Sequence, residues 1–327
     1  MSHFWRDRRV VVTGGSGLIG GWLVEELINN GADVIVLLRD WVPQSKLLSE
    51  EKLKKSTLVR GDLSDPKHLE RILSEYEVQS VFHLAAQTIV PIANKNPLST
   101  FESNVAGTWN LLEACRHVKS VSSIVAASSD KAYGDAPNLP YHEEMPLRAV
   151  YPYDVSKACA DMICLSYAKT FDLPVSTTRC GNFFGGGDLN WNRIIPGTIR
   201  SALRSETPII RSDGTLIRDY IYVEDAVNAY LTLSKALSED SNLKGEAFNF
   251  SNETQRTVLE LTNLILTELG SDLTPIVQGD NKGEIKAQYL DSSKASRLLG
   301  WKAQFGLEEG LSKTISWYKK YLETQHA

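Results

Sequence analysis

The sequence predicts an α/β fold, a doubly wound parallel sheet with a smaller mixed α/β lobe. In the first half of the chain, short apolar runs alternate with amphipathic stretches, which is the pattern of parallel strands joined by helices. A glycine-rich turn follows the first apolar run, at the place where such sheets connect a strand to a helix. After Cys180 the alternation stops, and glycine, proline and tryptophan interrupt the chain.

Six runs are expected to form the strands of one sheet, and four amphipathic segments are expected to form helices. The predicted strands are residues 9–13, 33–38, 57–59, 80–84, 122–127 and 175–179, and the predicted helices are residues 18–30, 66–76, 98–117 and 153–171. Such units join in right-handed crossovers, so helices cover both faces and the carboxyl ends of the strands meet at one edge. This is a Rossmann-type sheet.

The chain is expected to divide near residue 181. We assign residues 1–181 to the sheet domain and residues 182–327 to a second lobe that covers the carboxyl ends of the strands. Residues 218–237 are expected to return to the first domain, because Asp219-Tyr220-Ile221-Tyr222-Val223 is typical of a strand that runs into a helix.

Composition excludes several classes of protein. The 327 residues carry a formal net charge of −5, so we expect no nucleic-acid partner. No apolar run reaches the roughly 20 residues of a membrane span, and the first residues lack the apolar core of a secretion signal. The four cysteines show no spacing typical of a metal site. We therefore expect a cytoplasmic protein with reduced thiols and no metal.

The turn after the first predicted strand has the sequence Thr13-Gly14-Gly15-Ser16-Gly17-Leu18-Ile19-Gly20. Glycine allows a tight turn and a close approach of the backbone to a pyrophosphate, and the following helix offers unpaired N–H groups to the phosphates. A strand, this turn, a helix and a second strand together predict a dinucleotide site. The expected contacts are Gly14, Ser16, Gly17, Leu18, Ile19 and Gly20.

The end of the second predicted strand bears on the kind of dinucleotide. Leu38 stands where an acidic residue would bind the adenosine ribose, and Arg39 follows it. An arginine there suits a 2′-phosphate, so NADP is favoured over NAD, although Asp40 keeps NAD open. Asp62 and Leu63 follow the third strand, where Asp62 is either an adenine contact or a turn residue. The small residues after the fourth strand, Leu84, Ala85 and Ala86, leave room for the cofactor.

Two short segments carry the candidate chemistry. Ser128-Ser129-Asp130-Lys131-Ala132-Tyr133 ends the fifth predicted strand, and Tyr153 and Lys157 lie four residues apart on the next predicted helix, so they share a face. A tyrosine has an ordinary pKa near ~10. A neighbouring ammonium and a cationic nicotinamide ring are expected to lower the pKa of Tyr153 so that it serves as a general base. Lys157 is also expected to bind the nicotinamide ribose.

With these residues the sequence resembles the extended short-chain dehydrogenase/reductase family, in its nucleotide-sugar epimerase and dehydratase branch. Further shared motifs are Leu84-Ala85-Ala86-Gln87, Asn104-Val105-Ala106-Gly107-Thr108, Arg218-Asp219-Tyr220 and Leu299-Gly300-Trp301. Within this branch it is most similar to the sugar-nucleotide 4,6-dehydratases, above all those acting on CDP-glucose. The features shared with them are Phe4-Trp5-Arg6, Ser129-Asp130-Lys131 and Gly185-Gly186-Gly187-Asp188.

The resemblance implies roles for Asp130 and Lys131. A 4,6-dehydratase oxidises C4, removes the C5 proton and protonates the departing C6 hydroxyl, which requires an acid and a base beyond the tyrosine. Asp130, kept protonated by burial, is the expected acid, and Lys131, as a neutral amine, is the expected base. Many dehydratases carry Asp-Glu here, so the identity of the base stays open. If the two residues are only a solvated ion pair, the protein is a nucleotide-sugar 4-epimerase.

A third possibility is a non-catalytic NAD(P)-sensing protein, which the intact Tyr153 disfavours. The resemblance also implies contacts to a nucleotide-diphosphate sugar from Gln87, Ser129, Asn182, Arg193 and Arg218, with Arg211 a weaker candidate, and a cofactor contact from Asn104. It implies, finally, a homodimer in which the helices predicted at 98–117 and 153–171 form a four-helix interface.

Overall fold

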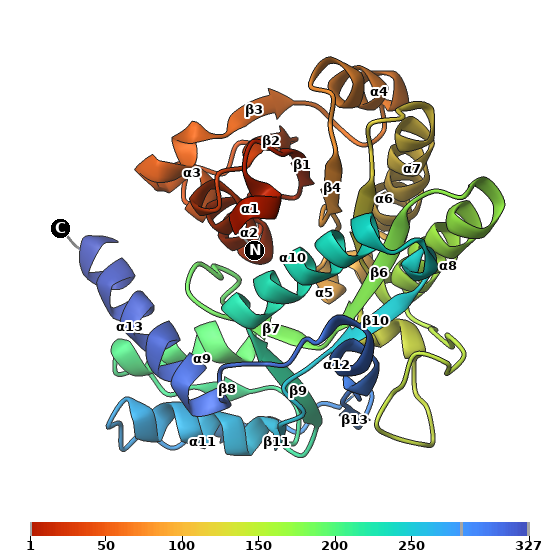
Figure 1. Cartoon of the computed structure of the whole chain (residues 1–327). Coiled ribbons are helices and arrows are strands. Elements are labelled where there is room, and N and C mark those ends of the chain that lie inside the picture. Colours follow the sequence, from red (N-terminus) through yellow and green to blue (C-terminus); the bar gives the residue numbers. More distant parts are fainter. Residues whose placement is uncertain (1, 282–283, 326–327) are drawn as a thin grey trace.

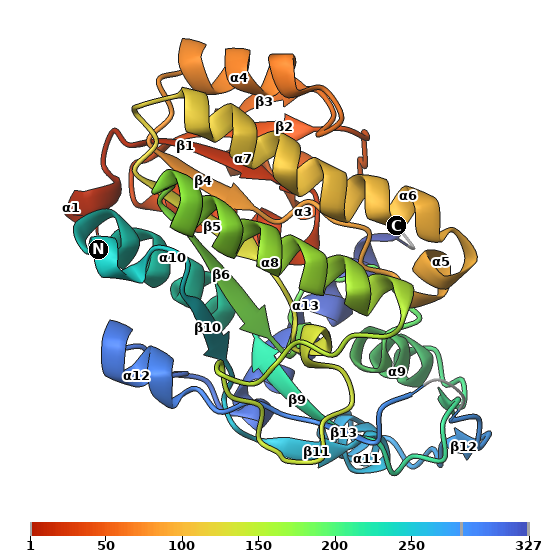
Figure 2. The same ribbon diagram turned by 90° about the vertical axis from the view of Figure 1, so that its right-hand side faces the viewer.

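The first sheet has seven parallel strands in the order β10-β6-β5-β4-β1-β2-β3 (Figures 1 and 2). The computed structural model describes residues 2–281 and 284–325. The strands are β1 Arg9–Thr13, β2 Asp33–Leu38, β3 Thr57–Arg60, β4 Ser80–His83, β5 Ser123–Ala127, β6 Val175–Cys180 and β10 Ala247–Phe250. The order runs outward from β1 in both directions, which confirms the predicted doubly wound fold.

Helices cover both faces of this sheet. On one face lie α4 Pro66–Glu75, α7 Gly107–His117 and α8 Pro152–Phe171, and on the other lie α2 Leu18–Asn29 and α10 Val223–Glu239 (Figures 1 and 2). Successive residues of β1 serve the two layers, because Val11 packs on the α4–α7 side while Val10 and Val12 pack on the α2–α10 side. This alternation follows from the two-residue period of a strand. Short segments α1 Ser2–Trp5, α3 Lys46–Ser49 and η1 Glu51–Lys55 flank α2.

The seventh strand, β10, was not predicted. It pairs with β6 from Ala247 opposite Thr177 to Phe250 opposite Cys180, although the sequence places residues 247–250 in the second lobe. The chain reaches β10 only after it has passed through that lobe and through α10 and η4 Ser241–Leu243. The local pattern of a short strand does not reveal which of two sheets it will join.

The long helix predicted at 98–117 is interrupted. It consists of α6 Pro97–Phe101, a π-helical turn η2 Glu102–Ala106, and α7, and it follows α5 Val90–Lys95. Asn104 lies in the π turn, buried, with its side chain directed at the loop after β4. A π turn carries one more residue per turn than an α-helix and often occurs at functional sites.

The second lobe is built around β9 Ile217–Tyr222. This strand pairs with β7 Asn182–Phe184 and β13 Ala287–Gln288 in parallel and with β11 Gln255–Thr257 antiparallel. The remaining elements are β8 Ile209–Ile210 paired with β12 Ile276–Val277, and the helices α9 Ile194–Leu203, α11 Val258–Glu268, α12 Ser293–Leu299 and α13 Leu307–Gln325.

Residues 218–237 serve both parts of the molecule. β9 belongs to the second sheet, whereas α10 runs back from its end and packs against α2 and β5 of the first domain (Figure 1). Among the described helices, none combines the length and the apolar character that a bilayer crossing requires.

Candidate active site

A cavity of about 1100 Å³ lies at the carboxyl edge of the first sheet, between the sheet and the second lobe. Its walls include the glycine turn after β1 and the residues that end β2, β4, β5 and β6. The opposite wall comes from the second lobe, from the segments around β7, α9 and β9. In open α/β sheets this crevice is where ligands bind.

The glycine turn fits the pyrophosphate of a dinucleotide. Gly14 has φ +75°, and a Cβ there would lie 2.7 Å from the backbone nitrogen of Ala85, so no other residue fits without moving the chain. A Cβ at Gly20 would collide with the carbonyl oxygen of Gly14. Gly17 is the N-cap of α2, and no side chain caps it. The N–H groups of the first turn of α2 therefore face the cavity, available to an anion.

The predicted adenosine side of the cavity is charged. The Nε of Arg39 lies 2.7 Å from an Asp40 carboxylate oxygen and 4.0 Å from one of Asp62. Asp62 also accepts a hydrogen bond from the Ser64 N–H at 2.8 Å, so it forms the turn and lines the cavity at once. The other predicted cofactor residues on the wall are Ser16, Leu18, Ile19, Leu63, Leu84, Ala85 and Ala86.

Two predicted contact residues lie behind the wall. The Asn104 amide accepts from the Gln87 N–H at 2.7 Å and donates to the Gln87 carbonyl at 3.1 Å and to the Ser156 hydroxyl at 2.9 Å. The Gln87 side chain accepts from the Ile89 N–H at 3.0 Å. Neither residue is on the cavity lining. In this structure they hold the loop after β4 in place instead of reaching the cavity.

Ser129, Asp130 and Lys131 lie at the end of β5, where η3 Asp130–Tyr133 turns the chain. The Ser129 hydroxyl donates to an Asp130 carboxylate oxygen at 2.9 Å. Asp130 is buried, while Lys131 is partly exposed and donates from Nζ to Oε1 of Gln288 at 3.0 Å. All three line the cavity together with Tyr153 and Lys157.

Burial is the largest influence on the pKa of Asp130. Loss of solvent raises the pKa of this carboxyl, and the charge of Lys131, the hydrogen bond from Ser129 and the charge of Arg218 oppose the rise only in part. A carboxyl group in such a place favours its protonated form. The direction agrees with its expected role as an acid.

Tyr153 and Lys157 share the buried face of α8, which Pro152 begins. Burial raises the pKa of Tyr153 to about 12, and the hydrogen bond with Ser129 and the charge of Arg193 work in the opposite direction. The sequence predicts the ammonium of Lys157 as one of two lowering groups, beside a bound nicotinamide ring, but Lys157 is not among the main groups acting on Tyr153. It donates instead to the carbonyl oxygen of Ala127 at 2.8 Å, and burial lowers the pKa of Lys157 to about 8.

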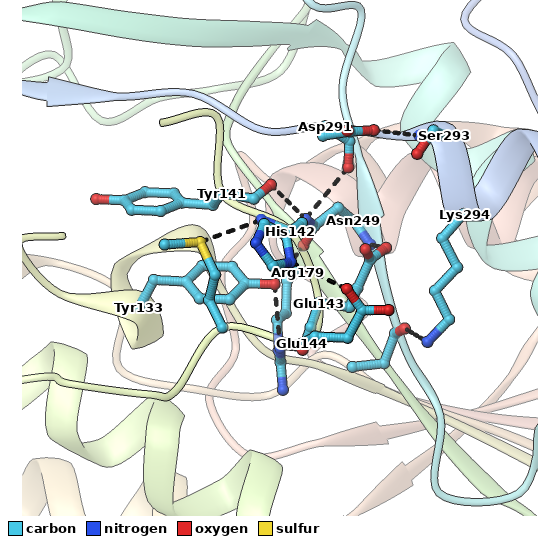
Figure 3. A network of polar contacts seen from close by, with 12 residues as sticks. Tyr133, Tyr141, His142, Glu143, Glu144, Arg179, Asn249, Asp291, Ser293 and Lys294 are labelled. Carbon is cyan, nitrogen blue, oxygen red and sulfur yellow. Dashed lines mark hydrogen bonds and ion pairs between the residues drawn. The ribbon is translucent and has the colours of Figure 1, made fainter. Parts of the chain in front are cut away.

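A polar network fixes the far end of the η3 turn (Figure 3). The Tyr133 hydroxyl donates to Asn249 of β10 at 2.8 Å and accepts from Arg179 of β6 at 3.0 Å. Arg179 in turn forms a two-fold hydrogen bond with Asp161 of α8, at 2.8 and 2.9 Å, and Asn249 donates to the Tyr141 carbonyl at 2.9 Å. The turn that carries Asp130 and Lys131 is thus tied to two strands and a helix.

The second lobe supplies the predicted cationic contacts. Arg218 is buried and pairs with a Glu284 oxygen at 2.9 Å. Arg193 pairs with Asp188 at 2.8 Å, and Arg211 donates to Asn192 at 2.8 Å. Asn182, Arg193, Arg211 and Arg218 all line the cavity, on the wall opposite the glycine turn. The structure therefore brings these four residues together on one wall of the cavity.

Three polar residues of the site had not been singled out. Asp154 is buried beside Tyr153, and its pKa is raised to about 6 by burial, against the charge of Lys131. Glu284 and Gln288 reach the site from a segment near the end of the chain. The position of Asp154 next to Tyr153 is a local signal, but nothing local marks Glu284 or Gln288.

The fold and this cavity define an extended short-chain dehydrogenase/reductase. The chain belongs to the GDP-mannose 4,6-dehydratase family, whose sequence model matches residues 11–314. It is 31% identical to a CDP-glucose 4,6-dehydratase from Salmonella typhimurium, over 98% of this chain and 93% of that one.

Solved structures agree with this assignment, and they include both a 4,6-dehydratase and a 4-epimerase. The dTDP-glucose 4,6-dehydratase DesIV from Streptomyces venezuelae, solved with NAD and TYD bound, superposes with a TM-score of 0.86 at 28% identity, covering 97% of this chain and 98% of that one. The UDP-glucose 4-epimerase from Thermotoga maritima, solved with UDP-glucose, gives a TM-score of 0.87 at 30% identity, covering 96% and 99%.

Proposed function

We propose that the protein is a nucleotide-sugar 4,6-dehydratase that favours a CDP-glucose-like substrate. The observation that carries this is the buried Asp130, which accepts from the Ser129 hydroxyl and lines the cavity together with Lys131. An epimerase has no use for a buried acid and an amine at this place, whereas elimination of water requires both. The 31% identity to a CDP-glucose 4,6-dehydratase supports the choice of substrate.

The residues divide the reaction between them. A bound nicotinamide dinucleotide, NAD or NADP, supplies a hydride acceptor for oxidation at C4 and a hydride donor for C6. Tyr153 accepts the proton of the C4 hydroxyl, and Ser129 holds the same hydroxyl by a hydrogen bond. Lys157 would bind the nicotinamide ribose, and the glycine turn would hold the pyrophosphate.

Elimination follows at the neighbouring carbons. The ketone at C4 acidifies the C5 proton, and Lys131 accepts that proton as a neutral amine. The bond between C6 and its oxygen breaks as the Asp130 carboxyl gives its proton to the departing hydroxyl, which leaves as water. Lys131 then returns the proton to C5, and with a hydride delivered to C6 from the bound dinucleotide the product would carry a ketone at C4 and a methyl group at C6, so the cofactor would not be consumed.

The diphosphate of the substrate is bound from the second lobe. Asn182, Arg193 and Arg218 bind it, since arginine pairs with phosphate oxygens in a two-fold geometry.

We also propose that the protein is a cytoplasmic homodimer. Exposed apolar side chains on α6, α7 and α8, namely Leu98, Trp109, Met162 and Leu165, support a helical interface between two copies.

The test is an incubation of the purified protein with CDP-, UDP-, GDP- and dTDP-hexoses, followed by mass analysis. Loss of one water from one of them, with no net reduction of added NAD or NADP, is the expected result. An isomer of unchanged mass would identify an epimerase and overturn the proposal.

Two variants separate the steps. Tyr153→Phe removes the proton acceptor at C4 and should abolish either activity. Lys131→Ala should lower the rate of water loss by about 10²–10⁴-fold, the usual contribution of a general base, while oxidation at C4 continues. A Lys131→Ala variant that releases water at the normal rate would show that another group is the base.

A further inference from the structure

Lys131 is held from the second lobe by a residue 157 positions further along the chain. Its Nζ donates to Oε1 of Gln288 at 3.0 Å, and Gln288, on β13, is completely buried. Lys131 therefore does not hang free on its turn. A hydrogen bond across the cavity wall determines where the amine points.

The amide of Gln288 has one orientation that suits this contact. Its Oε1 accepts from Lys131, whereas its buried Nε2 interacts with the Tyr141 hydroxyl but makes no well-formed hydrogen bond to a described residue. A buried donor without a partner costs roughly 1–3 kcal/mol. Turning the amide over would place an N–H donor against the N–H donors of the lysine, and an amide nitrogen accepts no hydrogen bond. The contact with Lys131 thus fixes the amide.

The segment that carries Gln288 also meets the proposed diphosphate site. β13 pairs with β9, so that Gln288 lies opposite Arg218, and Glu284 of the same segment pairs with the Arg218 guanidinium at 2.9 Å. One short stretch of the second lobe therefore contacts both the cation proposed for the diphosphate and the amine proposed for the C5 proton.

The partner of Lys131 is uncharged, and this matters for a base. The charge of Lys131 lowers the pKa of both Asp130 and Asp154, while Arg218 also lowers that of Asp130 and Glu284 raises that of Asp154. A further carboxylate in direct contact would bind the ammonium and oppose loss of its proton. An amide oxygen fixes the position of the nitrogen with much less preference for the charged form.

We propose that Gln288 is the positioning residue for Lys131: its amide oxygen aims the amine at C5 of the substrate and leaves it free to work as a neutral base. This role rests on the proposed dehydratase function. In this role Gln288 acts through Lys131 and contacts neither the substrate nor the cofactor.

The experiment compares Gln288→Leu and Gln288→Glu with the wild-type enzyme, using the nucleotide hexose that the wild-type enzyme dehydrates. Gln288→Leu should lower kcat about 10- to 100-fold with little change in KM, because the amine is misplaced. It should also increase the isotope effect with substrate deuterated at C5. Gln288→Glu should keep the position of the amine but move the rising limb of the pH–rate profile up by about one unit or more. Raising the pH should therefore rescue this variant and not Gln288→Leu.

The matched control is Gln255→Leu, the same substitution in the same sheet, where the amide donates to the carbonyl of Glu253. It should leave rate, isotope effect and pH profile unchanged. Full activity in Gln288→Leu, or equal losses in both Gln288 variants with an unaltered pH profile and a lowered melting temperature, would overturn the positioning role alone. A wild-type protein that removes water from no nucleotide hexose would refute the proposed function, and this role with it.

Discussion

At the scale of single residues, burial controls the chemistry of the site. Asp130 and Tyr153 are both raised in pKa by loss of solvent, and the pKa of Lys157 is lowered for the same reason. In each case burial shifts the balance toward the uncharged form relative to an exposed side chain. A cation beside the Tyr153 hydroxyl would lower its pKa from about 12 toward neutrality, so we expect the phenol to become an effective base only when the nicotinamide ring is bound.

Arg39 provides the first prediction. Its guanidinium lies half-exposed beside Asp40 and Asp62 at the predicted ribose position. If it pairs with a 2′-phosphate, Arg39→Ala should weaken NADP binding about tenfold or more and change NAD binding little. Calorimetric titration with each dinucleotide measures this. Equal losses for both, or tighter binding of NAD than NADP by the wild-type protein, would contradict the expected preference for NADP; solved neighbours contain NAD.

At the scale of elements, the site depends on turns that leave strand ends. The glycine turn joins β1 to α2, and η3 leaves β5. The glycine turn, and the position of Ser129-Asp130-Lys131 after the fifth strand, were predicted from sequence, since glycine spacing and this run are local signals. The π turn at 102–106 was not, because an α-helix and a π turn share the same apolar pattern and differ only in one hydrogen-bond register.

Gly14 provides the second prediction. A Cβ at this positive-φ position would press on the backbone of Ala85, so Gly14→Ala should displace the turn and weaken dinucleotide binding at least about 100-fold. Fluorescence titration with the cofactor would measure the loss. Gly279→Ala serves as a control, because Gly279 also has a positive φ, but a Cβ added there would meet no atom within 4 Å. Unchanged affinity in Gly14→Ala would remove the turn from the binding site.

Asp219 of β9 provides the third prediction. It is buried, accepts from the Ser251 hydroxyl and the Leu290 N–H, and burial raises its pKa to about 7. The folded state therefore binds a proton that the unfolded state has released, so the stability that this group adds is complete below pH about 4 and is lost as the pH rises through about 7.

Asp219→Asn cannot titrate, so it should lack this loss. We compare the free energy of unfolding of the variant with that of the wild-type protein at each pH. The difference, variant minus wild type, should increase by roughly 1–4 kcal/mol between pH 4 and pH 8. Urea unfolding at a series of pH values measures the difference. A gap that stays constant across this range would show that Asp219 is ionised throughout in the folded protein.

At the scale of the whole molecule, two lobes meet at the carboxyl edge of one sheet. The glycine turn and the catalytic group stand on the first lobe, and the candidate diphosphate contacts stand on the second. α10 and β10 bind the two lobes together, because α10 follows β9 of the second lobe, β10 precedes β11 of the second lobe, and both pack in the first (Figures 1 and 2).

The proposed dimer provides the fourth prediction. Met162 and Leu165 on α8 and Leu98 on α6 are exposed by 62%, 44% and 67%, and burying them against a second copy would be favourable. Met162→Glu should shift the protein from dimer to monomer in light scattering, because an interface would bury the new charge without a partner. Leu298→Glu, on α12 away from this face, should leave the mass unchanged. A monomeric wild-type protein at micromolar concentration would exclude the dimer.

The sequence by itself determined the doubly wound sheet, the glycine turn, and the segments that hold Ser129, Asp130, Lys131, Tyr153 and Lys157. A local pattern predicts each of these: a period of apolar residues, a spacing of glycines, or a spacing of four residues on a helix. The tertiary structure alone decided that β10 is the seventh strand, that Asn104 and Gln87 stand behind the cavity wall, and that Gln288 reaches Lys131. Those facts depend on contacts between distant parts of the chain, and burial and partners at such contacts follow from packing that no local pattern records.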